Sequence, residues 1–333
     1  MKIDIYAHML PQKYSNALDK IISKGPLVSQ TVKATPSLSD LEFRFNVMDK
    51  FDDLVQVLTL GNPPLESIAS QKDAVELAQI ANDELAELLN QHPDQFVGAV
   101  ACLPMNNLDA ALKEIDRTIT QLRFKGIQLY TNINGKPLDS PEFRPIYEKM
   151  ADYNLPIWLH PWKSPSEPDY VGEEGSMYKF CMTFSWPYQT TLAMTRLVYS
   201  GILEDYPNLT FITHHCGGMV PFFAQRIVWF FDSNEVMLRG AGFPRVYRRH
   251  PIEYFSRFYG DTVTSGSTSA LMCGYSFFGA DQMLFGTDMP YGSQSGLRQI
   301  RDSVQAVERM QISDDDKAKI FEGNARRLLR LPV

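Results

Sequence analysis

Short hydrophobic stretches rich in β-branched residues alternate with longer amphipathic stretches along the whole chain. Hydrophobic runs of this kind, bounded by turn residues, predict buried strands. They lie at 2–8, 54–60, 96–103, 125–131, 156–160, 209–215, 257–263 and 282–288. Between them, apolar residues recur every three or four positions, which predicts helices at 70–91, 108–122, 141–153, 221–238 and 314–331.

Regular alternation of strands and helices is typical of repeated βα units around a parallel sheet. With 333 residues, the chain exceeds the roughly 250 residues of a typical (β/α)₈ barrel. We therefore expect an α/β protein with one TIM-barrel domain over residues 1–333 and with long insertions. The insertions are the segments after the first and fifth predicted strands, at 9–50 and 161–185, and a third segment at 239–255. Segments that directly follow strands lie at the face where barrel active sites are built.

Composition and charge narrow the range of partners. Hydrophobic residues make up 44% of the chain and charged residues 21%, with a formal net charge of −7. This balance argues against nucleic acid or an anionic membrane surface as the main partner, since both require clustered cations. The sequence contains neither a basic, apolar leader nor an uninterrupted apolar stretch of about 18 residues, so we expect a cytoplasmic protein. Its four cysteines form no CxxC pair, which excludes a cysteine zinc motif.

Histidines are concentrated at the ends of predicted strands. His8 ends the first strand, His160 the fifth, and His214 with His215 the sixth, while Asp288 ends the eighth. Because the carboxyl ends of barrel strands meet at one face, these side chains are expected to converge. Neutral imidazoles and a carboxylate with open positions suit a catalytic zinc, manganese or iron ion. The pattern therefore predicts a site for one divalent metal, with zinc favoured.

Four sequence motifs, together with the order in which they occur, resemble those of the amidohydrolase superfamily. They are MKIDIYAHMLP, IWLHPW, THHCGGMVPFFAQRI and LFGTDMPY. More narrowly, they resemble the branch that contains aminocarboxymuconate semialdehyde decarboxylase and γ-resorcylate decarboxylase, over nearly the whole chain. The resemblance implies that His8, His160 and Asp288 are metal ligands and that His215 is a non-ligand acid/base histidine.

The first motif departs from the family pattern at Tyr6. Most members carry His-x-His or Glu-x-His there, whereas this chain has Tyr6-Ala7-His8. A phenol is a poor ligand while protonated, with a reference pKa near ~10, although a bound cation can lower that pKa. Tyr6 could therefore bind the metal as a phenolate, hydrogen-bond a substrate or water, or simply pack in a site that has lost its chemistry.

Three further assignments are expectations. Strand alternation allows only one of His214 and His215 to face the barrel, and the register of the motif favours His215. Arg44 falls where related decarboxylases hold a substrate carboxylate, the alternative being a solvated helix arginine. Six aromatic residues of the second insertion and its end could wall a substrate pocket, form the core of a lid or form a subunit interface: Trp162, Tyr170, Tyr178, Phe180, Phe184 and Trp186.

The resemblance implies a metal-dependent non-oxidative decarboxylase of a small aromatic or muconate-like carboxylate, with His215 and Asp288 as acid/base groups. The alternative is a hydrolase that uses metal-activated water on an ester, lactone, thioester or amide. The third hypothesis is a non-catalytic barrel that lost its activity because Tyr6 replaces the usual ligand. The expected partner is a small carboxylate or acyl substrate. A homodimer follows by analogy with the branch, with the basic segment Arg245–Arg249 reaching a neighbouring site.

Overall fold

The computed structural model describes residues 1–21, 34–233 and 247–331. A three-stranded parallel sheet holds β1 (Lys2–Met9), β2 (Leu54–Leu60) and β3 (Phe96–Ala99). A five-stranded parallel sheet holds β4 (Ile127–Tyr130), β7 (Ile157–His160), β8 (Phe211–Thr213), β9 (Tyr259–Asp261) and β10 (Met283–Leu284). Isolated bridges join Ala101 to Ile127 and Ala7 to Met289. They link the two sheets at both edges, so the strands close into the predicted (β/α)₈ barrel.

Several strands are shorter than the sequence pattern predicted. The sixth barrel strand, β8, ends at Thr213 instead of His215, and the eighth, β10, ends at Leu284 instead of Asp288. His215 and Asp288 have φ angles of 54° and 63°, in the left-handed region that extended strands exclude. A short antiparallel hairpin of β5 (Asn132–Ile133) and β6 (Lys136–Pro137) was not predicted.

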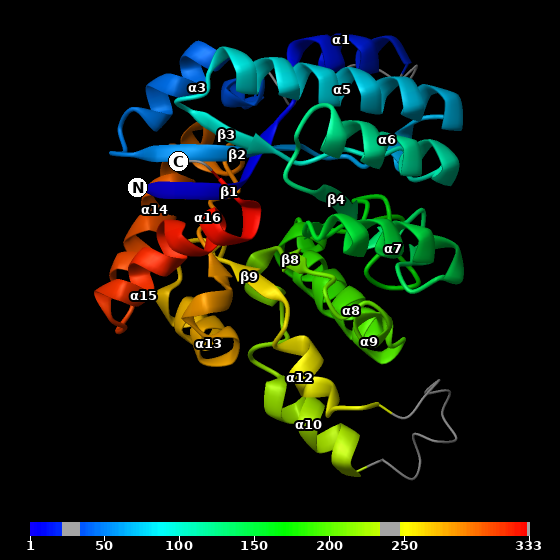
Figure 1. Ribbon diagram of the computed structural model, residues 1–333, viewed down its shortest axis with the longest axis vertical. Helices are drawn as coiled ribbons and strands as arrows, with labels where there is room; N and C mark the ends of the chain where they lie inside the picture. The colour runs from blue at the N-terminus through cyan, green and yellow to red at the C-terminus, as the bar shows by residue number, and fades with distance from the viewer. Residues whose placement is uncertain (22–33, 234–246, 332–333) are drawn as a thin grey trace.

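Helices form the outer layer. Figure 1 shows α5 (Gln71–Gln91) and α6 (Leu108–Thr120) running across the side of β1–β3, with α7 (Arg144–Tyr153) and α8 (Trp186–Tyr199) farther round. Ser70 caps α5 by accepting a hydrogen bond from the amide of Asp73. The other α-helices are α1 (Gln12–Ile21), α3 (Leu41–Met48), α4 (Leu65–Ile68), α9 (Ile202–Asp205), α10 (Ala224–Ser233), α12 (Pro251–Phe255), α13 (Thr268–Phe278), α14 (Leu297–Glu308), α15 (Asp314–Ala318) and α16 (Asn324–Leu329).

Two sequence expectations reach beyond the described residues. The helix predicted at 221–238 is observed as α10 up to Ser233, and its remainder lies outside them, as do Arg245 and the residue that follows it. Among the helices that the structure describes, none combines the length and apolar character needed to cross a membrane.

The barrel interior is a compact hydrophobic cluster. Alternate strand residues such as Ile3 and Ile5 on β1, and Val55 and Val57 on β2, belong to it. Trp158 of β7 crosses the interior, because its indole Nε1 donates a hydrogen bond to the carbonyl of Ile5, 2.9 Å away on a strand that is not its neighbour. Leu54 and Leu58, which flank Val55 and Val57 on β2, pack in a second cluster with the surrounding helices.

A β-bulge in β1 sets the direction of two candidate site residues. Asp4 pairs with Gln56 and Ala7 pairs with Leu58, so β1 has one residue more than β2 in this stretch. Ile5 and Tyr6 consequently both belong to the interior cluster, although they are consecutive. The extra residue turns Tyr6, and His8 two positions later, toward the inside of the barrel, as bulges beside active sites commonly do.

Candidate metal centre

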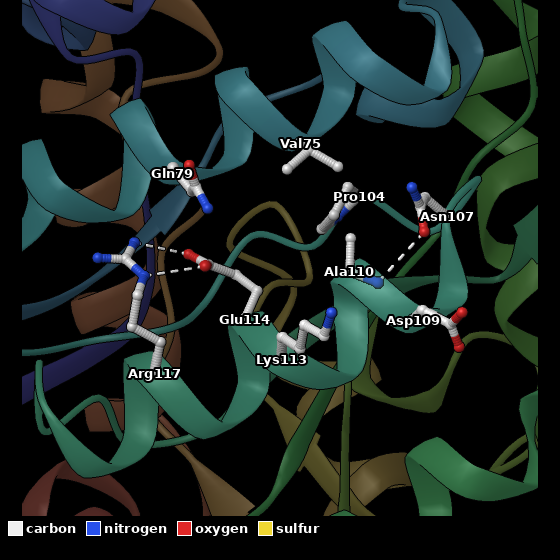
Figure 2. Close-up of a pocket in the computed structure, with 9 residues that line it drawn as sticks. All are labelled: Val75, Gln79, Pro104, Asn107, Asp109, Ala110, Lys113, Glu114 and Arg117. Atoms are coloured by element: carbon white, nitrogen blue, oxygen red, sulfur yellow. Dashed lines mark hydrogen bonds and ion pairs between the residues drawn. The ribbon is translucent and has the colours of Figure 1, made fainter.

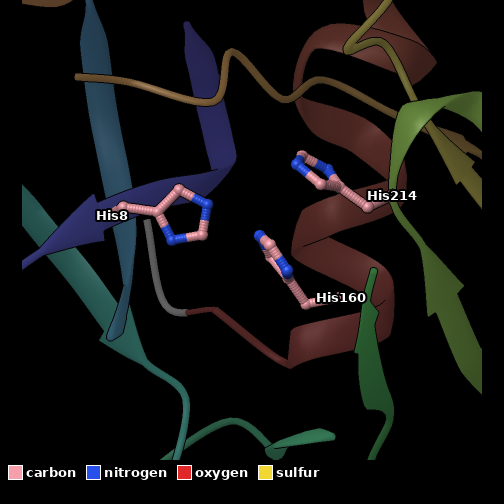
Figure 3. Close-up of side chains that lie close together, drawn as sticks. All are labelled: His8, His160 and His214. Atoms are coloured by element: carbon pink, nitrogen blue, oxygen red, sulfur yellow. The ribbon is translucent and has the colours of Figure 1, made fainter. Parts of the chain in front are cut away.

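Three histidines from three different strands converge inside the carboxyl end of the barrel. His8 lies on β1, His160 ends β7, and His214 directly follows β8. Each is at most 1% exposed, and one nitrogen of each lies within 4.8 Å of the corresponding nitrogens of the other two. Figure 3 shows the three rings directed toward a common space.

Each imidazole is held by a hydrogen bond at its Nδ1 atom. Nδ1 of His8 lies 2.9 Å from Oγ1 of Thr59, and Nδ1 of His160 lies 2.8 Å from the carbonyl oxygen of Pro161. Nδ1 of His214 lies 2.5 Å from Oδ2 of Asp261. These contacts fix the three rings and leave the Nε2 atoms available as ligands, which is the arrangement that surrounds histidines in metal sites.

Asp288 adds a carboxylate to this group. Its Oδ1 atom lies 3.1 Å from Nε2 of His8 and 3.4 Å from Nε2 of His214. Burial acts to raise the pKa of Asp288, but the two histidines lower it far below its usual value, so the carboxylate is ionised. Within the described chain, Nε2 of His8 lacks a partner with hydrogen-bond geometry. An orphaned imidazole nitrogen beside an ionised carboxylate is the donor set that zinc, manganese or iron requires.

The histidines differ in their electrostatic surroundings. Burial, together with His214 and His8, lowers the pKa of His160 well below its usual value, so this ring is neutral and able to bind a metal. Burial also acts to lower the pKa of His214, but the charge and hydrogen bond of Asp261, with those of Asp288, raise it to about 9. In the arrangement described, His214 therefore holds a second ring proton that His160 does not.

The expectation that His215 alone faces the barrel is corrected by the structure. Because β8 ends at Thr213, strand alternation no longer governs the next two residues, and both His214 and His215 offer a nitrogen close to a carboxylate oxygen of Asp288. His214 is the one that joins His8 and His160. Burial and His214 lower the pKa of His215 to about 3. His215 also borders a cavity of about 390 Å³ lined in part by Phe222 and Cys273.

Tyr6 packs directly against this centre. Its ring stacks on His214 with a centroid separation of 4.1 Å, and its side chain is fully buried. No described residue hydrogen-bonds its hydroxyl group. Burial, and then the charges of Asp261 and Asp288, raise the pKa of Tyr6 well above its usual value. These surroundings favour the neutral phenol.

Arg44 occupies neither of the two positions expected from the sequence, at a substrate carboxylate or in solvent. It is fully buried on α3, and its guanidinium donates hydrogen bonds to the carbonyl oxygen of His8 at 2.9 Å, that of Ser37 at 3.0 Å and Oε1 of Gln56 at 2.9 Å. Gln56 pairs with Asp4 on the outer side of the bulged strands. Arg44 is therefore neither a solvated arginine nor one that points into the barrel, because it supports the backbone of His8 from behind.

The aromatic residues of the second insertion separate into two groups. Trp186 and Tyr130 have ring centroids 5.9 Å and 5.3 Å from that of His160, and Trp162 packs against Tyr130. The remaining four are exposed to solvent and so do not enclose a pocket. They are Tyr170, Tyr178, Phe180 and Phe184.

Residues that the sequence reasoning left without a role also contribute. Asp261 lies within the predicted strand at 257–263 and was given no role, yet its Oδ1 accepts hydrogen bonds from the amides of Cys216 and Val263 while Oδ2 binds His214. Its position at the end of a barrel strand was the available signal. Thr59 has no such signal, because a threonine on a strand is ordinary.

A separate cavity of about 470 Å³ lies between α5 and α6, outside the barrel. Figure 2 shows the pair of Glu114 and Arg117 at its edge, with Val75 and Gln79 on the facing helix. Because Glu114 is already paired with Arg117, this cavity offers no converging ligands like those of the barrel.

The chain is similar to known proteins over most of its length. The sequence matches the amidohydrolase family over residues 3–331. It is 27% identical to 2-amino-3-carboxymuconate-6-semialdehyde decarboxylase of Dictyostelium discoideum, over 99% of this chain and 92% of that protein. It is 30% identical to γ-resorcylate decarboxylase of Rhizobium radiobacter, over 86% of each.

A solved structure extends the likeness to three dimensions. It is a dihydroxybenzoic acid decarboxylase from Polaromonas sp. JS666 with bound manganese and the inhibitor 2-nitroresorcinol. The two structures superpose with a TM-score of 0.80 and 26% identity, covering 99% of this chain and 96% of that one. With its barrel, its converging histidines and this similarity along almost its whole length, the chain belongs to the amidohydrolase family.

Proposed function

We propose that this protein is a metal-dependent non-oxidative decarboxylase of a small aromatic carboxylate. The observation that carries the proposal is the convergence of His8, His160 and His214 on Asp288, with each imidazole held at Nδ1. Relatives named as decarboxylases match over most of this chain, and this supports a carboxy-lyase over a hydrolase.

In this proposal His8, His160 and Asp288 would hold one divalent metal ion, as the sequence resemblance implied. The ion would supply positive charge that fixes the substrate carboxylate and stabilises charge developing on the ring. Zinc was favoured from the sequence, but the manganese in the Polaromonas structure makes manganese the first ion to test. Two imidazoles and a carboxylate suit either ion.

The proton required by the reaction is assigned to His214. Decarboxylation breaks the bond between the ring carbon and the carboxylate, CO₂ leaves, and the electron pair that remains on the ring carbon takes up one proton. His214 is placed to deliver it, because Asp261 holds its Nδ1 and raises its pKa to about 9. His215, the acid/base residue expected from the sequence, is the second candidate. A positioned general acid contributes roughly 10²–10⁴-fold to rate.

The test is an assay of CO₂ release from γ-resorcylate and related dihydroxybenzoates by the manganese-loaded protein, with a panel of short acyl esters in parallel. CO₂ release that is lost in His214→Asn and retained in His215→Asn supports both the reaction and the assignment. Acid release from an ester without CO₂ release would establish hydrolysis instead. Loss in His215→Asn alone would return the acid/base role to His215.

We also propose a homodimer. The support is the set of large apolar side chains left exposed on α10 and directly before it, including Phe222 at 77% and Trp229 at 61% exposure. Monomeric proteins seldom leave several such side chains in one region uncovered. Sedimentation of wild type and Trp229→Asp tests this, since a dimer that uses this surface dissociates in the variant. A monomeric wild type at micromolar concentration contradicts it.

A further inference from the structure

The carboxyl end of the barrel has a second group of polar side chains, separate from the histidines. Tyr14 lies on α1 after β1, Glu66 on α4 after β2, and Gln128 and Tyr130 on β4. The histidine centre draws its residues from β1 and from β7 to β10. The second group therefore occupies the β1–β4 half of the same face.

The two groups touch each other. The ring of Tyr130 packs edge-on against His160 with a centroid separation of 5.3 Å. On the other side, Tyr291 lies with its ring 5.3 Å from that of His8. Tyr14 and Cys102 pack in one buried cluster that also contains Leu65, the residue before Glu66, and Tyr291 packs against this cluster. Burial raises the pKa of Tyr130 well above its usual value.

Polar atoms in this group lack partners although they are shielded from solvent. Tyr14, Gln128 and Glu66 are 0%, 6% and 7% exposed. Considering only the part of the chain that the structure describes, the hydroxyl of Tyr14, Oε1 of Gln128 and Oε1 of Glu66 form no hydrogen bond. The Nε2 atom of Gln128 reaches the hydroxyl of Tyr130 only at 3.3 Å. A buried polar group left unpaired costs about 1–3 kcal/mol, and three beside one another indicate a missing hydrogen-bonding partner.

We propose that Tyr14, Glu66, Gln128 and Tyr130 form a buried polar subsite that hydrogen-bonds hydroxyl groups on the part of the substrate farthest from its reacting carboxylate. This inference rests on the proposed function for the position of that carboxylate. Tyr130 links the two groups, because its ring packs on His160 and its hydroxyl lies 3.3 Å from Nε2 of Gln128.

The chemistry of the subsite selects uncharged polar groups. Its phenols donate hydrogen bonds and its glutamine can donate and accept, while none of the four side chains is a cation. Burial raises the pKa of Glu66 to about 7, so the carboxyl group itself both donates and accepts when protonated. A second substrate carboxylate would be desolvated there without a positive partner. The subsite therefore favours a hydroxylated benzoate over a dicarboxylate.

Equilibrium binding to the manganese-loaded protein tests this inference. The probes are benzoate, 4-hydroxybenzoate, 3,5-dihydroxybenzoate and isophthalate, measured by calorimetry. We expect at least one of the two hydroxylated probes to bind about tenfold more tightly than benzoate, which corresponds to one well-made hydrogen bond. Isophthalate is expected to bind more weakly than benzoate.

Variants identify the residues responsible. Tyr130→Phe, Glu66→Gln and Tyr14→Phe are each expected to reduce the ratio of benzoate to hydroxybenzoate dissociation constants at least threefold. Tyr14→Phe removes only an unpartnered hydroxyl, so it keeps the test valid if another variant fails to fold. Tyr147→Phe is the matched control, because Tyr147 is fully buried but its hydroxyl already donates to the carbonyl of Leu138.

The outcome separates the subsite from the proposed function. The subsite is overturned if the ratio of benzoate to hydroxybenzoate dissociation constants is near one in the wild-type protein. It is also overturned if this ratio is unchanged in every variant that still binds manganese. A hydroxyl preference that the variants remove, in a protein that releases no CO₂, supports the subsite while the proposed reaction fails. CO₂ release by a protein that shows no preference for hydroxylated probes supports the proposed reaction and overturns the subsite.

Discussion

Nδ1 of His214 lies 2.5 Å from Oδ2 of Asp261, and both side chains are buried in the barrel. The carboxylate fixes the imidazole through one nitrogen and turns the other toward Asp288. If His214 is the acid/base group, Asp261→Asn removes the negative charge that keeps it protonated. We expect kcat to fall by about 100-fold, with little change in bound manganese.

Metal analysis and steady-state kinetics of Asp261→Asn check this prediction. Asp302→Asn is the control, since Asp302 is a surface carboxylate paired with Arg298 and Arg301. Should manganese affinity fall in parallel with kcat, His214 acts as a ligand and the acid/base assignment is wrong.

Removal of ligands should remove the metal. His8→Ala and His160→Ala are each expected to weaken manganese binding at least about 100-fold, more than loss of a residue that only orients a ligand. Chelation of the wild-type protein should abolish turnover, and added manganese should restore it. Titration with manganese monitored by calorimetry measures the affinity, and His92→Ala is a control outside the centre. Stoichiometric metal in both ligand variants would contradict the assigned ligand set.

Tyr6→Phe distinguishes the three roles left open for Tyr6. Its fully buried hydroxyl has no hydrogen-bond partner among the described residues, and its pKa is raised. We therefore expect the variant to keep its manganese and to change the free energy of unfolding by less than about 1 kcal/mol. Retained metal with lost turnover shows that the hydroxyl contacts substrate or water. Loss of metal in the variant would show that Tyr6 binds as a phenolate.

Arg44→Met tests the position of the buried guanidinium. Because Arg44 donates to His8, Ser37 and Gln56, its removal leaves these buried acceptors unpaired and should destabilise the protein by about 1–3 kcal/mol for each of them. Urea denaturation measures this, with the exposed Arg298→Met as a control. If Arg44 binds substrate instead, Arg44→Met should raise KM and leave stability unchanged. That result would restore the assignment made from the sequence.

Glu66 gives a prediction about stability and pH. Burial raises its pKa in the folded protein from 4.5 to about 7. The folded state therefore favours the protonated carboxyl, so the contribution of Glu66 to stability is fully present below pH 4.5 and is lost as pH rises through 7. Relative to the wild type, Glu66→Gln should gain up to about 3 kcal/mol of stability between pH 4.5 and pH 8. Denaturation of both proteins across that range checks it, and parallel curves would show that folding does not shift the pKa of Glu66.

Much of the fold was readable from the sequence. The alternation of hydrophobic runs with amphipathic stretches determined the barrel, because strands buried on both faces and helices buried on one have different periods. Position at or shortly after the carboxyl end of a strand was enough to bring His8, His160 and Asp288 to one face, since a parallel barrel collects its carboxyl ends there.

Only the tertiary structure decided where the remaining side chains point. Strand alternation allowed only one of His214 and His215 to face the barrel, and the motif register favoured His215. However, β8 stops at Thr213 and the positive φ of His215 breaks the alternation. Arg44 supports the backbone of His8 from the outer face, because the bulged strand β1 and helix α3, 36 residues later, meet there. The polar group around Glu66 is assembled from α1, α4 and β4, which are distant in the sequence, so no local pattern predicts it. Local periodicity determines which elements form, whereas contacts between distant segments determine what each side chain touches.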